Sequence, residues 1–205
     1  MTRIKICGVT SPAQALACVD AGADSVGVNF VRSSVRRVDE ETARGIAAAV
    51  GSTALVVGVV AGMSVSEMRA LKAVTGVGCL QLHGDEAPED VEALLPHAYK
   101  AVRVAAQDDV ARARAMPGAY VLVDAKVEGA LGGTGHSFDW ALVVDLARSR
   151  RLVLAGGLTP DNVKRAVEEV RPWCVDVASG VESAPGVKDP AKVRAFVGAV
   201  RSAKI

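Results

Sequence analysis

Aromatic side chains are scarce in this sequence. Phe, Trp and Tyr make up 3% of the 205 residues, although half of the chain is hydrophobic. A core must therefore be built mainly from Val, Ala, Leu and Ile, and so high an apolar content argues against a disordered chain. The length fits one domain or two small ones, and we expect residues 1–205 to form a single domain.

No charge of one sign dominates the chain. It has 24 Lys and Arg against 23 Asp and Glu, and the two signs are interspersed. This pattern lacks the basic stripe of a nucleic-acid-binding surface, so we expect no nucleic-acid partner. No apolar run reaches the roughly 20 residues that cross a bilayer, and the first residues, "MTRIKICG", form no secretion signal. We therefore expect a cytoplasmic protein with no membrane partner.

The cysteines lack the spacing of a metal site. None belongs to a CxxC pair, and the three His residues do not cluster with them. This spacing argues against zinc, so we expect no metal and reduced thiols. The four cysteines are Cys7, Cys18, Cys79 and Cys174.

Short apolar runs alternate with helical patterns along the chain. The helical stretches carry start signals, such as Ser11 before Pro12, Thr159 before Pro160, and Ser64 three residues before Glu67. Runs this apolar, separated by helices, indicate a parallel sheet covered by helices. The predicted strands are 3–7, 24–30, 54–60, 78–82, 100–104, 120–124, 152–156 and 174–178.

Eight strand–helix units predict an α/β fold of the (β/α)8, or TIM, barrel type. About 200 residues is near the lower size limit for this fold. The alternative is an open doubly wound sheet, which usually has a glycine-rich fingerprint after its first strand. Here a single glycine, Gly8, follows the first strand, which favours the barrel.

Polar residues at the strand ends are the candidate site residues, because the loops after the strands carry the active sites of such barrels. Carboxylates are almost never buried unpaired, so an aspartate that closes an apolar strand should face a polar cleft. The alternative roles of Asp124, the last residue of "YVLVD", are a helix cap or a salt bridge to Lys126. The candidates are Cys7, Gln81, His83, Asp124 and Asp176, of which His83 has a turn cap as its alternative role.

Alternation along the first strand places Lys5 and Cys7 on one face, opposite its two isoleucines, and therefore inside the barrel. A buried lysine must be paired, and an ammonium near Cys7 would favour the thiolate over the thiol. The other interpretation of Cys7 is a small buried hydrophobe, which suits Cys18 and Cys174 better.

Two turns rich in small residues predict a phosphate site. Gly156 and Gly157 follow the seventh strand, and Ser179 and Gly180 follow the eighth. Without a Cβ, a glycine lets backbone N–H groups approach an anion closely. The loops after strands seven and eight are the usual phosphate site of these barrels.

Six motifs, in order along the chain, resemble the phosphoribosylanthranilate isomerase family. They are "KICGVT" (5–10), "QLHGDE" (81–86), "VLVDA" (121–125), "GGTGHSFDW" (132–140), "LAGGLTPDNV" (154–163) and "VDVASGVESAPGVKD" (175–189). The resemblance implies a role in tryptophan biosynthesis. It implies an Amadori rearrangement of N-(5-phosphoribosyl)anthranilate to 1-(2-carboxyphenylamino)-1-deoxyribulose 5-phosphate, without cofactor or metal.

The resemblance also implies roles for individual residues. Asp124 would be the general acid that protonates the ring oxygen, and Cys7 the general base that removes the C2′ proton. Arg36 would hold the anthranilate carboxylate, although the adjacent Arg37 stays open as an alternative. Gln81, His83 and Asp176 would lie at the substrate, the phosphate would rest on backbone amides near Gly157, Gly180 and Val181, and Gly133 would help to close the site.

Two rival functions fit the sequence less well. A related histidine-pathway isomerase would carry aspartates at both catalytic positions, so the cysteine that ends the first strand argues against it. A barrel that only senses a sugar phosphate would not need both Cys7 and Asp124. The sequence leaves the oligomeric state open between a monomer and a homodimer.

Overall fold

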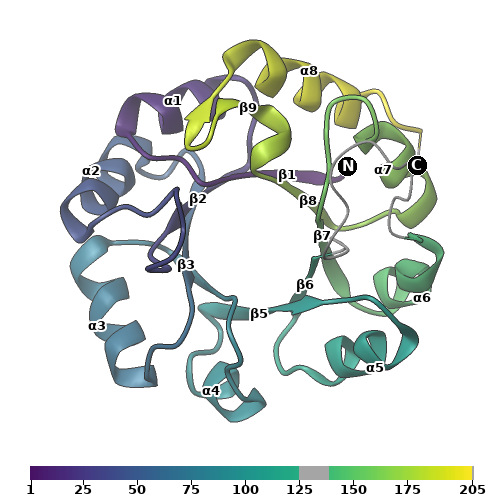
Figure 1. The fold of residues 1–205 in the computed structure, drawn as a ribbon, viewed down its shortest axis with the longest axis horizontal. Coiled ribbons are helices and arrows are strands. Elements are labelled where there is room, and N and C mark those ends of the chain that lie inside the picture. The colour runs from purple at the N-terminus through teal and green to yellow at the C-terminus, as the bar shows by residue number, and fades with distance from the viewer. Residues whose placement is uncertain (125–138, 205) are drawn as a thin grey trace.

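The strands form a closed parallel barrel in the computed structural model, which describes residues 1–124 and 139–204. In these two stretches eight strands follow one another in sequence order, and β8 closes on β1. The helices surround the ring of strands (Figure 1). The predicted (β/α)8 barrel is therefore confirmed, and the open doubly wound sheet is wrong.

The strands lie within about two residues of the predicted runs. They are β1 (Arg3–Cys7), β2 (Ser25–Asn29), β3 (Leu55–Val60), β4 (Cys79–Leu82), β5 (Ala98–Arg103), β6 (Tyr120–Asp124), β7 (Arg151–Ala155) and β8 (Cys174–Val177). The helices are α1 (Pro12–Asp20), α2 (Glu40–Val50), α3 (Val65–Thr75), α4 (Pro88–Ala93), α5 (Gln107–Ala115), α6 (Ala141–Ser149), α7 (Val163–Val170) and α8 (Pro190–Arg201).

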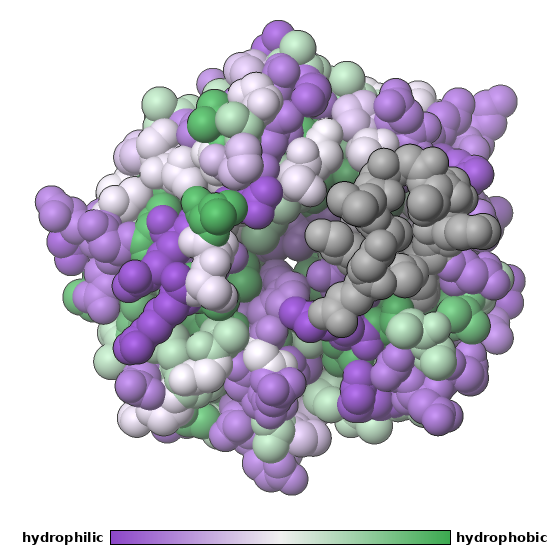
Figure 2. Space-filling model, in the orientation of Figure 1, coloured by the Kyte–Doolittle hydropathy of each residue, from purple (hydrophilic) through white to green (hydrophobic). Residues whose placement is uncertain are grey.

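A short hairpin lies at the rim of the barrel after β8. A 3-10 helix, η1 (Ser179–Val181), leads into the antiparallel pair β9 (Glu182–Ala184) and β10 (Val187–Lys188). The Thr10 hydroxyl donates to the carbonyl of Gly186, which ties the hairpin to the loop after β1. The surface is hollowed at the centre of the ring, and hydrophilic side chains gather around the hollow (Figure 2).

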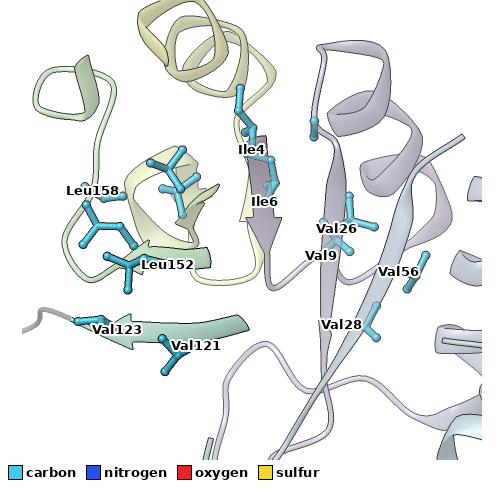
Figure 3. Packing of buried hydrophobic residues seen from close by; sticks show 14 of the residues in the cluster. Ile4, Ile6, Val9, Val26, Val28, Val56, Val121, Val123, Leu152 and Leu158 are labelled. Carbon is cyan, nitrogen blue, oxygen red and sulfur yellow. The ribbon is translucent and has the colours of Figure 1, made fainter. Parts of the chain in front are cut away.

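Side-chain alternation along the strands divides the core into two layers. One layer lies between sheet and helices and includes Ile4 and Ile6 of β1 and Val121 and Val123 of β6 (Figure 3). Residues at the alternate positions fill the barrel itself: Val57, Tyr99, Ala101, Leu122, Val153, Ala155 and Cys174. Because Lys5 alternates with the isoleucines, its buried side chain lies in the inner layer, as predicted.

The predicted helix starts are correct in two cases and wrong in one. Ser11 caps α1, and Ser64 forms a full capping box with Glu67 at the start of α3. Thr159 and Pro160 do not start α7, which begins at Val163. Asn162 instead accepts from the Thr159 N–H and donates to the Gly157 carbonyl, which holds a turn ahead of the helix.

No helix in the described part of the chain is long and apolar enough to cross a bilayer.

Candidate active site

A cavity of about 350 Å³ lies at the carboxyl ends of the strands. The turns after β7 and β8 and the end of β1 form one part of its wall, and the ends of β4 and β6 form another. Its lining includes ten of the predicted site residues: Cys7, Arg36, Gln81, His83, Asp124, Gly156, Gly157, Asp176, Ser179 and Gly180. The closed barrel therefore brings together residues from the first strand to the last.

Cys7 ends β1 and is half-buried in this cavity. Burial raises the pKa of the Cys7 thiol, Lys5 lowers it, and Asp176 raises it again, with the net result above the ordinary value. Lys5 thus favours the thiolate, as expected, but the net rise in the pKa of Cys7 counts against a thiolate in the free protein. The cation is present as predicted, but removal of the sulfur from water outweighs it.

Lys5 is paired inside the barrel, as a buried lysine must be. Its ammonium lies 2.8 Å from Asp176 Oδ2, and it donates to Gln81 Oε1 at 3.0 Å. Burial alone would lower the pKa of Lys5, but the adjacent Asp176 raises it well above the ordinary value, so Lys5 is a cation. Asp176 Oδ1 has no hydrogen-bond partner among the described residues and is available to accept from a ligand.

The tautomer of His83 follows from this network. Lys5 and the Tyr99 hydroxyl both donate to Gln81 Oε1, so the Gln81 amide nitrogen faces His83 Nδ1 at 2.9 Å and donates to it. The imidazole proton then lies on Nε2, which is 3.8 Å from Asp124 Oδ2. Burial lowers the pKa of His83, so the ring is neutral at pH 7.

Asp124 ends β6 and lies across the cavity from Cys7's strand. It is half-buried, and its strand neighbour in register on β5 is Arg103, which also lines the cavity. An aspartate beside a neutral histidine and in reach of a cavity can hold or release a proton at a bound ligand.

Arg36 and Arg37 point to different places. Arg36 lines the Cys7 cavity, whereas the exposed Arg37 lines a separate groove with Arg32. Arg36 donates to both oxygens of Glu182, at 2.7 and 2.6 Å. Of the two predicted carboxylate-binding arginines, the structure brings Arg36 to the cavity.

The two glycine-containing turns meet at the cavity edge. Gly156 and Gly157 have φ values of 92° and 67°, which favour glycine. A Cβ built at Gly180 would overlap the carbonyl oxygen of Leu158, so only glycine lets the turns after β7 and β8 pack backbone to backbone. Val181 is fully buried in the core and is not among the lining residues, so its phosphate role stays a prediction.

Gly133, predicted to help close the site, lies outside the described residues. In residues 1–124 and 139–204, no three His, Cys, Asp or Glu side chains form a group that could hold a metal ion.

The sequence interpretation missed three residues of the site. Glu182 binds Arg36 from a segment 146 residues away. Gly27 on β2 leaves room for the Cys7 sulfur, because a Cβ there would lie 2.7 Å from Sγ. Tyr99 joins the buried network through Gln81. The signal for Glu182 was its place in "SGVES", a motif already matched to the turn after the eighth strand.

Comparisons with known proteins agree on one family. The model of the family "N-(5'phosphoribosyl)anthranilate (PRA) isomerase" matches residues 4–199. A relative from Pseudomonas aeruginosa (strain LESB58), named N-(5'-phosphoribosyl)anthranilate isomerase, is 51% identical over 98% of this chain and 95% of its own.

Solved structures give the same result. The crystal structure of phosphoribosyl anthranilate isomerase from Thermotoga maritima superposes with a TM-score of 0.90 at 37% identity, covering 98% of this chain and 99% of that one. A phosphoribosyl anthranilate isomerase in complex with reduced 1-(o-carboxyphenylamino)-1-deoxyribulose 5-phosphate superposes with a TM-score of 0.87 at 34% identity, covering 98% and 99%. The chain belongs to the N-(5'-phosphoribosyl)anthranilate isomerase family.

Proposed function

We propose that this protein converts N-(5-phosphoribosyl)anthranilate to 1-(2-carboxyphenylamino)-1-deoxyribulose 5-phosphate by an Amadori rearrangement in tryptophan biosynthesis. The observation that carries the proposal is that Cys7, from β1, and Asp124, from β6, line one cavity whose edge is formed by two glycine-containing turns. This arrangement supplies a base, an acid and a cradle for an anionic group around one small ligand.

Asp124 acts first, as the general acid. It gives its proton to the ring oxygen as the C1′–O bond breaks, and the nitrogen lone pair forms the C=N bond of a protonated Schiff base. His83 lies beside Asp124 with a neutral ring, and its Nε2 is 3.8 Å from Asp124 Oδ2.

Cys7 acts second, as the general base. The adjacent iminium makes the C2′ hydrogen acidic, and Cys7 removes that proton in its thiolate form, which the raised pKa of the thiol makes the minor form in the free protein. The electron pair of the C–H bond then forms the C1′=C2′ bond of an enolamine. Tautomerisation adds a proton at C1′ and removes one from the C2′ hydroxyl, so the substrate gains and loses equal numbers of protons. Asp124 then takes up a proton and Cys7 releases one, which returns both groups to their starting states. The steps need no covalent bond to sulfur.

The remaining groups bind the substrate. The Arg36 guanidinium holds the anthranilate carboxylate. Asp176 Oδ1, which is buried and without a partner among the described residues, accepts from a sugar hydroxyl. The turns that contain Gly157 and Gly180 hold the phosphate with backbone N–H groups. Together these contacts fix the C1′–C2′ bond between acid and base.

Loss of substrate fluorescence on mixing with purified protein tests the proposal. Cys7→Ala and Asp124→Asn should each fold normally and lower turnover by at least ~100-fold. Cys18→Ala, which changes a buried thiol of α1 that does not line the cavity, is the control and should retain turnover. No turnover by the unsubstituted protein would refute the function, and near-normal turnover in either variant would refute that residue's role.

A further inference from the structure

Glu182 is a buried carboxylate that takes no part in the proposed proton transfers. It begins β9, and its side chain is only 5% exposed. Oε1 accepts from Arg36 Nε at 2.7 Å, and Oε2 accepts from Arg36 Nη2 at 2.6 Å. Two parallel hydrogen bonds of this kind fix the plane of the guanidinium as well as its position.

Glu182 leaves part of the Arg36 guanidinium available. A guanidinium has five N–H donors in one plane, and Glu182 occupies the edge formed by Nε and Nη2. Within residues 1–124 and 139–204, Nη1 of Arg36 has no hydrogen-bond partner. The edge formed by Nη1 and Nη2 is therefore open to a second carboxylate, and Arg36 lines the cavity where one would bind.

The charge of this cluster leaves room for one further anion. Lys188, at the end of β10, is 3% exposed and lies 2.7 Å from Glu182 Oε1. Arg36 and Lys188 carry two positive charges against one negative charge on Glu182, which leaves a net charge of +1. Lys188 also keeps Glu182 ionised and in place when Arg36 engages a ligand.

The aliphatic part of the Arg36 side chain packs against the backbone of Gly8. A Cβ built at Gly8 would overlap Cδ of Arg36, so the arginine crosses directly over the backbone that follows Cys7. Gly8 has a φ of 78°, a conformation that favours glycine. The position of the guanidinium is thereby linked to the end of β1.

We infer that Glu182 is a positioning residue, which orients Arg36 so that its free edge selects the aryl carboxylate of the substrate. This inference rests on the proposed function, since that function supplies the carboxylate. A ligand without the carboxylate would cover the free edge of Arg36 in the cavity and leave its donors unpaired, which is the physical basis of discrimination.

Calorimetric titration with two ligands tests the positioning role. One ligand is reduced 1-(o-carboxyphenylamino)-1-deoxyribulose 5-phosphate, and the other is its counterpart without the carboxyl group. Glu182→Gln should weaken binding of the first roughly 10-fold and change binding of the second less than about twofold. Lys192→Gln is the control, because the Lys192 ammonium donates to the backbone carbonyl of Glu182 and not to its carboxylate, so it should change neither affinity.

Two further variants keep the test decisive if Glu182→Gln does not fold. Glu182→Asp keeps a charge for Lys188 but is too short to reach both nitrogens of Arg36, so it should show the same selective loss. In an Arg36→Lys background, adding Glu182→Gln should weaken binding of the carboxylated ligand by less than about twofold. A lysine ammonium has no planar pair of donors for Glu182 to orient. Equal weakening of both ligands, or of neither, would overturn the positioning role while leaving the proposed function intact. Binding of neither ligand by the unsubstituted protein would overturn both.

Discussion

The surroundings of the Cys7 sulfur shift the pKa of its thiol in opposite directions. Burial disfavours the thiolate, Lys5 favours it, and Asp176 disfavours it, and the pKa of the thiol is raised overall. Lys5 is itself held by Asp176, so its cation is shared between the sulfur and a carboxylate. The strength of the base therefore depends on a buried pair one layer below it.

The rate at which iodoacetamide alkylates Cys7 should follow this raised pKa. Only the thiolate reacts, so the rate should rise with pH to a midpoint above the ordinary thiol value of ~8.5. Peptide mass spectrometry of the free protein between pH 6 and pH 10 can follow Cys7 separately from the other three cysteines. A midpoint at or below the ordinary value would show that Lys5 outweighs burial.

Gly27 should be required for the position of the sulfur. A Cβ at this residue would lie 2.7 Å from Cys7 Sγ and 3.2 Å from Lys5 Nζ, so Gly27→Ala must displace one of them. A shift of about 1 Å in a catalytic group can cost ~100-fold, so we expect kcat/KM to fall by roughly 10- to 100-fold. Gly198→Ala in α8, where a Cβ meets nothing within 4 Å, is the matched control. Unchanged kcat/KM in Gly27→Ala would contradict the assigned position of the base.

The elements that matter most to the site are the turns after β7 and β8. They meet where Gly180 passes the Leu158 carbonyl, and Asn162 holds the first of them ahead of α7. The hairpin β9–β10 then carries Glu182 and Lys188 back to the cavity rim. Under the proposed function, one continuous stretch after β8 would contact both anionic ends of the substrate.

Gly180→Ala should separate the two turns and weaken phosphate binding. The added methyl group overlaps the backbone of Leu158, so we expect the KM for the phosphorylated substrate to rise roughly 10-fold. Gly62→Ala is a suitable control, because Gly62 is also a loop glycine, with a φ of 66°, but lies after β3. That control should lose stability without a change in KM. Equal effects of both substitutions on KM would place the phosphate elsewhere.

Sequence pattern predicted the strands well because each is a short apolar run between helical stretches. It also predicted that Cys7 and Asp124 share a site, since a closed barrel brings its strand ends together. It could not predict the start of α7, because the side chain of Asn162 competes for the backbone groups that a helix would use. Nor could it predict Glu182 or Gly27, whose roles depend on side chains that converge only in space.

At the scale of the whole molecule, buried ion pairs join strands and loops around the site. Lys5 pairs with Asp176 inside the barrel, Glu182 joins the hairpin to the loop after β2, and Glu86 pairs with Lys100 at 3.2 Å. Removing one partner of such a pair leaves the other charge uncompensated and is strongly destabilising. The stability of the barrel is therefore linked to the ionisation of its carboxylates.

This linkage predicts loss of stability in acid. Burial alone would raise the pKa of Glu86, but hydrogen bonds from backbone N–H groups, including that of Gly62, and the charge of Lys100 lower it overall. A lowered folded-state pKa gives stability that is present above the unfolded value of ~4.3 and is lost as the pH falls through the folded value. Urea unfolding at pH 7 and at steps below pH 5 should show this decline, and Glu86→Gln should reduce it. An identical decline in the variant would rule out Glu86 as a source.

The position of the sugar between Cys7 and Asp124 is the claim on which the rest depends. A crystal structure of this protein with reduced 1-(o-carboxyphenylamino)-1-deoxyribulose 5-phosphate measures it directly. We predict C2′ of the analogue within roughly 4 Å of Cys7 Sγ, and its C4′ hydroxyl oxygen, which is the ring oxygen of the substrate, within roughly 4 Å of an Asp124 carboxylate oxygen. An analogue bound with either atom away from its side chain would contradict the proposed chemistry.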